Sequence, residues 1–210
     1  AFFYLRVAVP TYPVSAKILL NDQKKGGFDS SASMLAEFGF NSTNANAENE
    51  IEVIKSMSVI RGAVDMTKLN VSYAVSGLFT NAPIYADESP LKVTFGVDGS
   101  GNVLPDAMAA LASTLNMEFN LEDKSNIALV YSCKTNGDDE PKEFTAEIKS
   151  LPYTLVTPVG NVLIEKGTAY DDFSKELLVN VNPLGEVALS CMKALAVAPI
   201  SKTSSVATID

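Results

Sequence analysis

The stretch NANAENEIEVIKSMSVIRGAVDMTKLNVSY, residues 44–73, carries the clearest periodic pattern in this chain. Apolar side chains recur in it at helical spacing, at Val53, Met57, Ile60 and Val64. This spacing predicts an amphipathic helix of about five turns, with Ile51 and Ile54 widening its apolar face. Asn46 can cap the helix, and acidic residues at positions 48, 50 and 52 suit the positive end of its dipole. Beyond Lys68 the letters become β-rich, so the helix is expected to lead directly into a strand.

The charged side chains of this helix fall away from its apolar face. Glu50, Lys55 and Arg61 are expected to point to solvent or to a neighbouring subunit. The apolar face is expected to lie across a sheet that the two ends of the chain share, since residues 12–20 and 204–210 both have strand patterns.

Composition indicates a folded protein that does not bind nucleic acid. The chain has 210 residues, of which 47% are hydrophobic, enough for a sizeable core. Its formal net charge is −9, and its 16 basic residues are scattered, so a phosphate backbone would be repelled. The basic doublet Lys24-Lys25 is interpreted as part of a solvated loop.

The residue inventory argues against an enzyme. With no histidine, catalytic triads and histidine-ligated metal sites are excluded within these residues. No phosphate loop and no nucleophile elbow occurs, and Cys133 and Cys191 have no metal-ligand spacing, although a disulfide between them stays open. The sequence therefore predicts no catalytic, cofactor-binding or metal-binding residues.

Acidic clusters are interpreted as turns. Asp98, Ser100 and Asn102 have the alternate spacing of a calcium loop, but Val103 stands where that loop needs glycine. The acidic runs at 138–140 and 171–172 lie in polar loops. Solvent there removes the difference in acidity that a catalytic pair of carboxylates needs. A hydrolase that uses two carboxylates, such as Asp171 and Glu186, is the weakest functional hypothesis. Two formal glycosylation acceptors, Asn41 and Asn70, carry little weight.

The order of patterns predicts an α+β fold. We expect a mixed sheet with the amphipathic helix packed on it in the N-terminal half, a second helix at residues 183–196, and an inserted antiparallel hairpin module. The domains would be an α+β core at 1–96 and 166–210, which the resemblance described below implies is membrane-proximal, and a β-rich insertion at 97–165. No apolar run reaches the ~20 residues of a membrane span, and AFFYLRVAVP, residues 1–10, is interpreted as the end of a membrane helix rather than a buried strand.

Several segments resemble one family. Residues 49–56, NEIEVIKS, match an N-E-[IV]-E-[IVL]-[IL]-[KR]-S segment, and LPYTLVTPVGNVLI at 151–164 and MKALAVAPISKTSSVATI at 192–209 are also similar. The chain resembles the external domain of the polysaccharide chain-length determinant (Wzz-type) proteins. The similarity is to the Bacteroides-type subgroup in which this domain is fused to a cytoplasmic tyrosine autokinase. It is weakest at 97–150.

The resemblance implies a non-catalytic domain at the periplasmic face of the inner membrane. Such domains assemble with copies of themselves, and the implied partners also include polysaccharide polymerase or export machinery. The chain would thereby regulate the length or export of a capsular or exopolysaccharide. The candidate interface residues are Glu50, Glu52, Lys55 and Arg61, which could instead simply solvate the helix. Any kinase activity belongs to sequence outside these residues.

A different class of function also fits the hairpin pattern. The chain would then be a secreted carbohydrate- or protein-binding module, with aromatic residues such as Tyr131 or Tyr153 in its binding surface.

Overall fold

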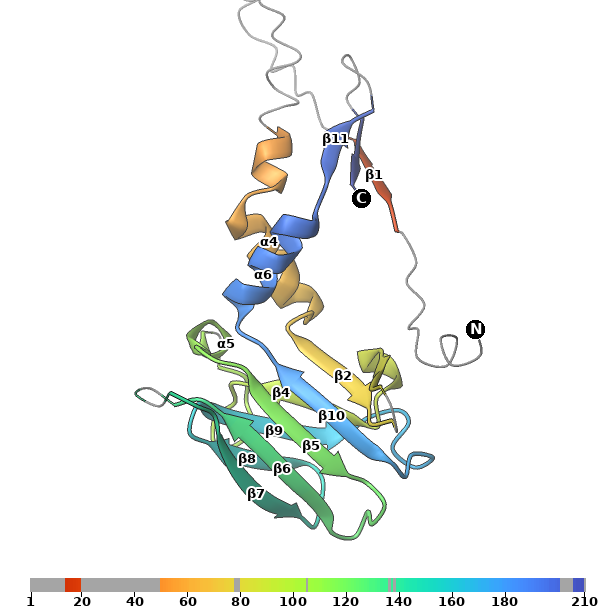
Figure 1. Ribbon diagram of the computed structural model, residues 1–210, viewed down its shortest axis with the longest axis vertical. Helices are drawn as coiled ribbons and strands as arrows, with labels where there is room; N and C mark the ends of the chain where they lie inside the picture. The colour runs from red at the N-terminus through yellow and green to blue at the C-terminus, as the bar shows by residue number, and fades with distance from the viewer. Residues whose placement is uncertain are drawn as a thin grey trace, which may run out of the picture. The chain divides into compact units, whose positions relative to one another are not determined.

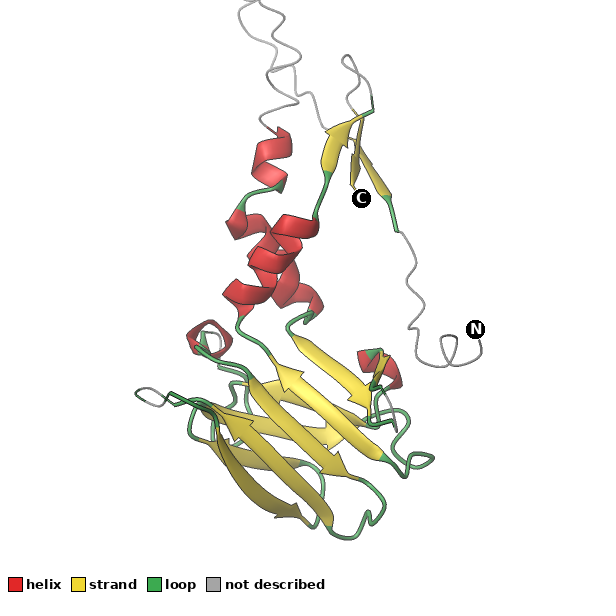
Figure 2. Ribbon diagram, viewed as in Figure 1, coloured by secondary structure: helices red, strands yellow, loops and turns green. Residues whose placement is uncertain are grey.

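The computed structural model describes residues 14–19, 50–77, 80–104, 106–135, 137, 139–200 and 206–209 (Figure 1). It combines helices with antiparallel sheets, so the predicted α+β class is confirmed (Figure 2). The chain divides into two compact units, and the described parts are residues 64–187 in the first unit and 14–19, 50–63, 188–200 and 206–209 in the second. The interpretations of residues 1–10, Lys24-Lys25, Asn41 and Asn46 fall outside the described residues.

The first unit is built on a six-stranded sheet in the order β3-β2-β10-β5-β6-β7. Its strands are β2 (Val71–Val75), β3 (Ala82–Ile84), β5 (Leu115–Asn120), β6 (Ile127–Cys133), β7 (Lys142–Ile148) and β10 (Glu176–Val181). Burial alternates along them, so that Leu115, Met117 and Phe119 of β5 point into the core while their neighbours point outward. This two-residue period is the one that the sequence displays.

A second sheet completes the core of the first unit. It has the order β4-β9-β8 and contains β4 (Leu91–Phe95), β8 (Tyr153–Thr157) and β9 (Gly160–Lys166). Val93, Val162 and Ile164 of this sheet belong to one hydrophobic cluster with Phe119 and Val179 of the six-stranded sheet. The two sheets therefore bury their inner faces against each other as a sandwich does.

The predicted mixed sheet is wrong, because every described ladder is antiparallel. The short connections between β5, β6 and β7, and between β8 and β9, are hairpins, and a parallel pair would need a long crossover. The strands of residues 97–165 also pair beyond that range, β5 with β10 and β9 with β4. The boundaries of the two compact units thus differ from those of the predicted domains.

The second unit holds a sheet made from distant parts of the chain. β1 (Ala16–Leu19) pairs with β12 (Val206–Ile209), which pairs in turn with β11 (Val197–Pro199). The prediction that residues 12–20 and 204–210 share a sheet is therefore confirmed. Ile51 is buried in one cluster with Ala207, and Ile18 and Ile54 pack against this cluster. The first turn of the amphipathic segment thus covers the shared sheet.

The predicted continuous helix is interrupted. Residues 50–54 are helical, residues 55–56 are not, and α4 begins again at Met57 and runs through Thr67. At the break the amide of Ser56 bonds to the carbonyl of Val53, three residues back instead of four. Because of this break, the apolar side chains before residue 55 and after residue 56 do not form one continuous buried face. Ile60 and Val64 are buried as predicted, but Val53 is 61% and Met57 39% exposed, so their predicted packing is wrong.

Short helices complete the described chain. α5 (Ala107–Ala110) is a single turn, and η1 (Ala86–Glu88) follows β3. α6 (Leu184–Ala194) occupies the predicted second helix. The strands β3 and β11, each three residues long and each containing a proline, were not predicted.

Candidate functional site

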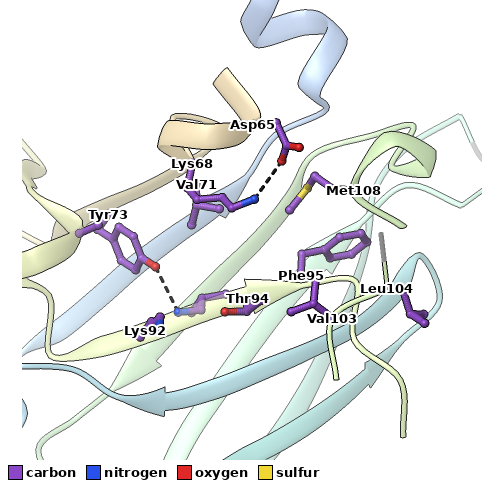
Figure 3. Close-up of a pocket in the computed structure, with 12 residues that line it drawn as sticks. Asp65, Lys68, Val71, Tyr73, Lys92, Thr94, Phe95, Val103, Leu104 and Met108 are labelled. Atoms are coloured by element: carbon purple, nitrogen blue, oxygen red, sulfur yellow. Dashed lines mark hydrogen bonds and ion pairs between the residues drawn. The ribbon is translucent and has the colours of Figure 1, made fainter. Parts of the chain in front are cut away.

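The first unit contains a cleft of about 590 Å³. It lies where the end of α4, strand β2, the edge strand β4 and the segment after β4 come together (Figure 3). Most of its lining is apolar, from Val71, Val93, Phe95, Val103, Leu104 and Met108. This volume and this lining are typical of sites that hold small molecules.

One wall of the cleft depends on the turn after β4. Gly96 has φ +80°, and a Cβ at this position would lie 2.6 Å from the Cβ of Ala107. The carbonyl of Gly96 accepts a hydrogen bond of 2.8 Å from the amide of Leu104, and Val97 pairs with Val103. Glycine therefore allows the chain to fold back closely, which places Val103 and Leu104 on the cleft.

The turn itself is organised by Asp98. Its Oδ1 accepts hydrogen bonds from the amides of Ser100 and Asn102, at 2.8 and 2.9 Å, and its Oδ2 accepts one from the Asn102 side chain at 3.0 Å. These bonds hold the pKa of Asp98 below its ordinary value, because they favour the ionised form. The carboxylate serves its own loop, as expected for a turn rather than a calcium site.

Hydrogen-bond donors gather along the polar part of the cleft. The buried hydroxyl of Tyr73 accepts a hydrogen bond of 3.1 Å from the amide of Val93. Burial raises the pKa of Tyr73, so the phenol stays protonated at neutral pH. Lys92 is exposed at the cleft, and Lys68 forms an ion pair of 2.9 Å with Asp65. Asp65 is the one carboxylate among the described residues that line the cleft, so these residues do not supply the pair of acids that a carboxylate hydrolase needs.

An incompletely bonded amide lies behind the cleft. Asn70 is fully buried, and its Nδ2 contacts the sulfur of Met108 at 3.0 Å and the carbonyl of Asn182 at 3.5 Å. Its Oδ1 has no hydrogen-bond partner within the described part of the chain. Asn70 is thus no accessible glycosylation acceptor.

The predicted interface residues lie in the second unit and not in the cleft. Glu50 and Lys55 are half-buried, while Glu52 and Arg61 are exposed. The ion pair recorded among the described residues is Lys68 with Asp65, and none of these four takes part in it. Their charges are therefore open to contact with another molecule or with solvent.

The other candidate residues that the sequence singled out lie outside the lining of the cleft. Asp171 and Glu186 are both exposed, as are Asp139 and Glu140. Cys133 is buried and Cys191 half-buried, and both are free thiols. Tyr131 is 8% exposed and stacks on Phe144 with ring centroids 5.2 Å apart, so it is a core residue rather than a sugar-binding platform. Tyr153 is half-buried.

Sequence reasoning did not find the cleft. Its lining comes from five separate elements between Asp65 and Met108, and no motif connects them. The one local signal was the glycine-rich turn at 98–102, which indicates a reversal of the chain but not what the returning residues meet.

No protein-family model matches this chain, and no curated protein matches it significantly. Among the described residues, no helix is both long and apolar enough to span a bilayer. The described residues also hold no group of three cysteine, aspartate or glutamate side chains that could bind a metal ion.

Proposed function

We propose that this chain is a non-catalytic periplasmic domain of a polysaccharide co-polymerase. It assembles with copies of itself and regulates the length or export of a surface polysaccharide. The proposal starts from the resemblance at residues 49–56, 151–164 and 192–209. In it the chain works at the inner membrane beside polymerase or export machinery, and residues 97–165 are an inserted hairpin segment whose strands complete both sheets.

The observation that carries the proposal is the exposure of three apolar side chains on the helical segment of the second unit. Val53, Met57 and Val59 are 61%, 39% and 44% exposed. Glu52 and Arg61, also exposed, lie in the same short segment. Apolar side chains bordered by charges are typical of a protein interface, where the apolar centre supplies affinity and the charges supply orientation. We therefore place the contact between copies on residues 52–61.

The ladder between β1 and β12 supports the same proposal. It joins residues 16–19 to residues 206–209, and Ile51 and Ile54 pack on this sheet. The first turn of the helical segment is thus fixed on the sheet, which leaves the exposed Val53 on a rigid support. Membrane anchors would raise the effective concentration of such domains, so even a weak interface could assemble them.

The test uses the full-length protein in the cells that produce it. Glu52→Lys and Met57→Glu are expected to change the polysaccharide length distribution on gels, while circular dichroism of the purified chain stays unchanged. Glu147→Lys, an exposed charge reversal on β7, is the matched control and should leave the distribution unchanged. A normal distribution with both interface variants would reject the proposal.

A further inference from the structure

The cleft in the first unit combines an apolar body with a donor-rich end. Figure 3 shows Tyr73 and Lys92 toward one end and Phe95, Val103 and Leu104 toward the other. A ligand that fills it would have to be apolar along most of its length, because a polar chain would lose its hydration against these side chains without gaining partners. At the end of the cleft near Tyr73 and Lys92, a ligand would instead need hydrogen-bond acceptors.

The polar end offers donors in excess of acceptors. The Tyr73 hydroxyl accepts from the amide of Val93, and its own proton has no recorded acceptor among the described residues. The ammonium of Lys92 has no ion-pair partner there. Away from this end, on the side of Met108, Lys68 carries three N–H donors, of which Asp65 accepts one at 2.9 Å (Figure 3). A ligand would supply the acceptor for the Tyr73 hydroxyl and the Lys92 ammonium.

We propose that this cleft binds an amphipathic anion, with an aliphatic chain against Phe95, Val103, Leu104 and Met108 and a carboxylate or phosphate head at Lys92 and Tyr73. A single anionic head would accept from the phenol and the ammonium together, and bonds to a charged acceptor are stronger than neutral ones. Met108 is a flexible side chain that can adjust around the ligand's aliphatic chain. This site is independent of the proposed contact between copies, which uses residues 52–61.

The experiment compares ten-carbon compounds that differ only in the head. Binding of decanoate, decyl phosphate, decanol and decyltrimethylammonium to the full chain is measured by calorimetry below their micelle concentrations. We expect an anion to bind about tenfold more tightly than decanol, the difference that one charge-assisted hydrogen bond supplies. The cation should bind more weakly than decanol. Whether decanoate or decyl phosphate binds better distinguishes a fatty-acid from a phosphate source.

Variants separate the head from the chain contacts. Lys92→Met should reduce anion affinity about tenfold and leave decanol binding unchanged, because it removes a charge and keeps an apolar stem. Val103→Glu, at a position 63% exposed, should weaken every anion without unfolding the chain. Lys149→Met, an exposed lysine outside the cleft, is the control and should change nothing.

The proposal is overturned by any of three results. They are no binding of either anion, equal affinity for decanol and the anions, or a loss in Lys149→Met as large as in Lys92→Met. Because none of these measurements involves residues 52–61, they do not test the proposed assembly function, and failure of that function would leave them unchanged.

Discussion

The amide of Val93 donates a hydrogen bond of 3.1 Å to the hydroxyl of Tyr73 and so joins two sheets through one side chain. Val93 lies in β4, an edge strand of the three-stranded sheet, and Tyr73 lies in β2 of the six-stranded sheet. Edge strands leave one row of main-chain groups without a ladder partner. Here a phenol from the other layer satisfies one of them at the cleft.

Tyr73→Phe should lower the free energy of unfolding by about 1–3 kcal/mol, because it leaves the buried amide of Val93 without an acceptor. Urea denaturation measures this change. Tyr85→Phe is the matched control, since Tyr85 is 81% exposed and should contribute little. Equal stability of the two variants would show that the bond between the sheets is unimportant.

The same residue should make stability depend on pH in alkaline solution. Burial raises the pKa of Tyr73 above its ordinary value of about 10, so the unfolded chain loses this proton at lower pH than the folded chain. The contribution of Tyr73 to the stability of the fold is fully present below pH ~10 and is lost as pH rises toward the folded pKa.

Burial also raises the pKa of Tyr131 and Tyr170. We therefore expect the stability of Tyr73→Phe to decline less steeply in alkaline solution than that of the wild type, but still to decline. Urea midpoints measured between pH 8 and pH 11 should therefore converge for wild type and variant as the pH rises. Parallel curves would contradict the assignment.

Gly96→Ala should destabilise the chain by about 1–3 kcal/mol. Its φ of +80° disfavours any Cβ, and the added carbon would lie 2.6 Å from the Cβ of Ala107. Gly99→Ala controls for the loss of glycine as such, because a Cβ there meets nothing within 4 Å. Thermal unfolding should show a lower midpoint only for Gly96→Ala. If both variants unfold alike, close approach at Gly96 is not what shapes the turn.

Substitutions of Asn70 should separate the role of its polarity from that of its volume. The amide has an unsatisfied Oδ1 and only long or weak bonds from Nδ2, so Asn70→Leu should change the unfolding free energy by less than about 1 kcal/mol. Asn70→Asp should cost about 3 kcal/mol or more, because it buries a carboxylate without a cation. Chemical denaturation at neutral pH measures both. A large loss in Asn70→Leu would indicate that the amide makes a stronger bond than these distances suggest.

Local pattern predicted much of the secondary structure. The alternation of Leu115, Met117 and Phe119 predicts a half-buried strand, and β5 is one. The glycine-rich letters at 98–102 predict a turn, and Asp98 organises one. The break at residues 55–56 was not predictable, because the apolar spacing fits a continuous helix equally well, and the exposure of Val53 depends on that break.

The sequence by itself determined the α+β class and most strand positions, because these follow from side-chain periods of 2 and 3.6 and from burying apolar faces. Only the tertiary structure decided that β10 lies between β2 and β5, that the described strands form antiparallel sheets, in what register residues 16–19 pair with 206–209, and that Tyr73 reaches Val93. It also decided the cleft, whose walls come from elements with no shared local signal. The physical reason is that the partner of a strand or a side chain is selected by packing across the whole core, whereas periodicity specifies only which face each segment buries.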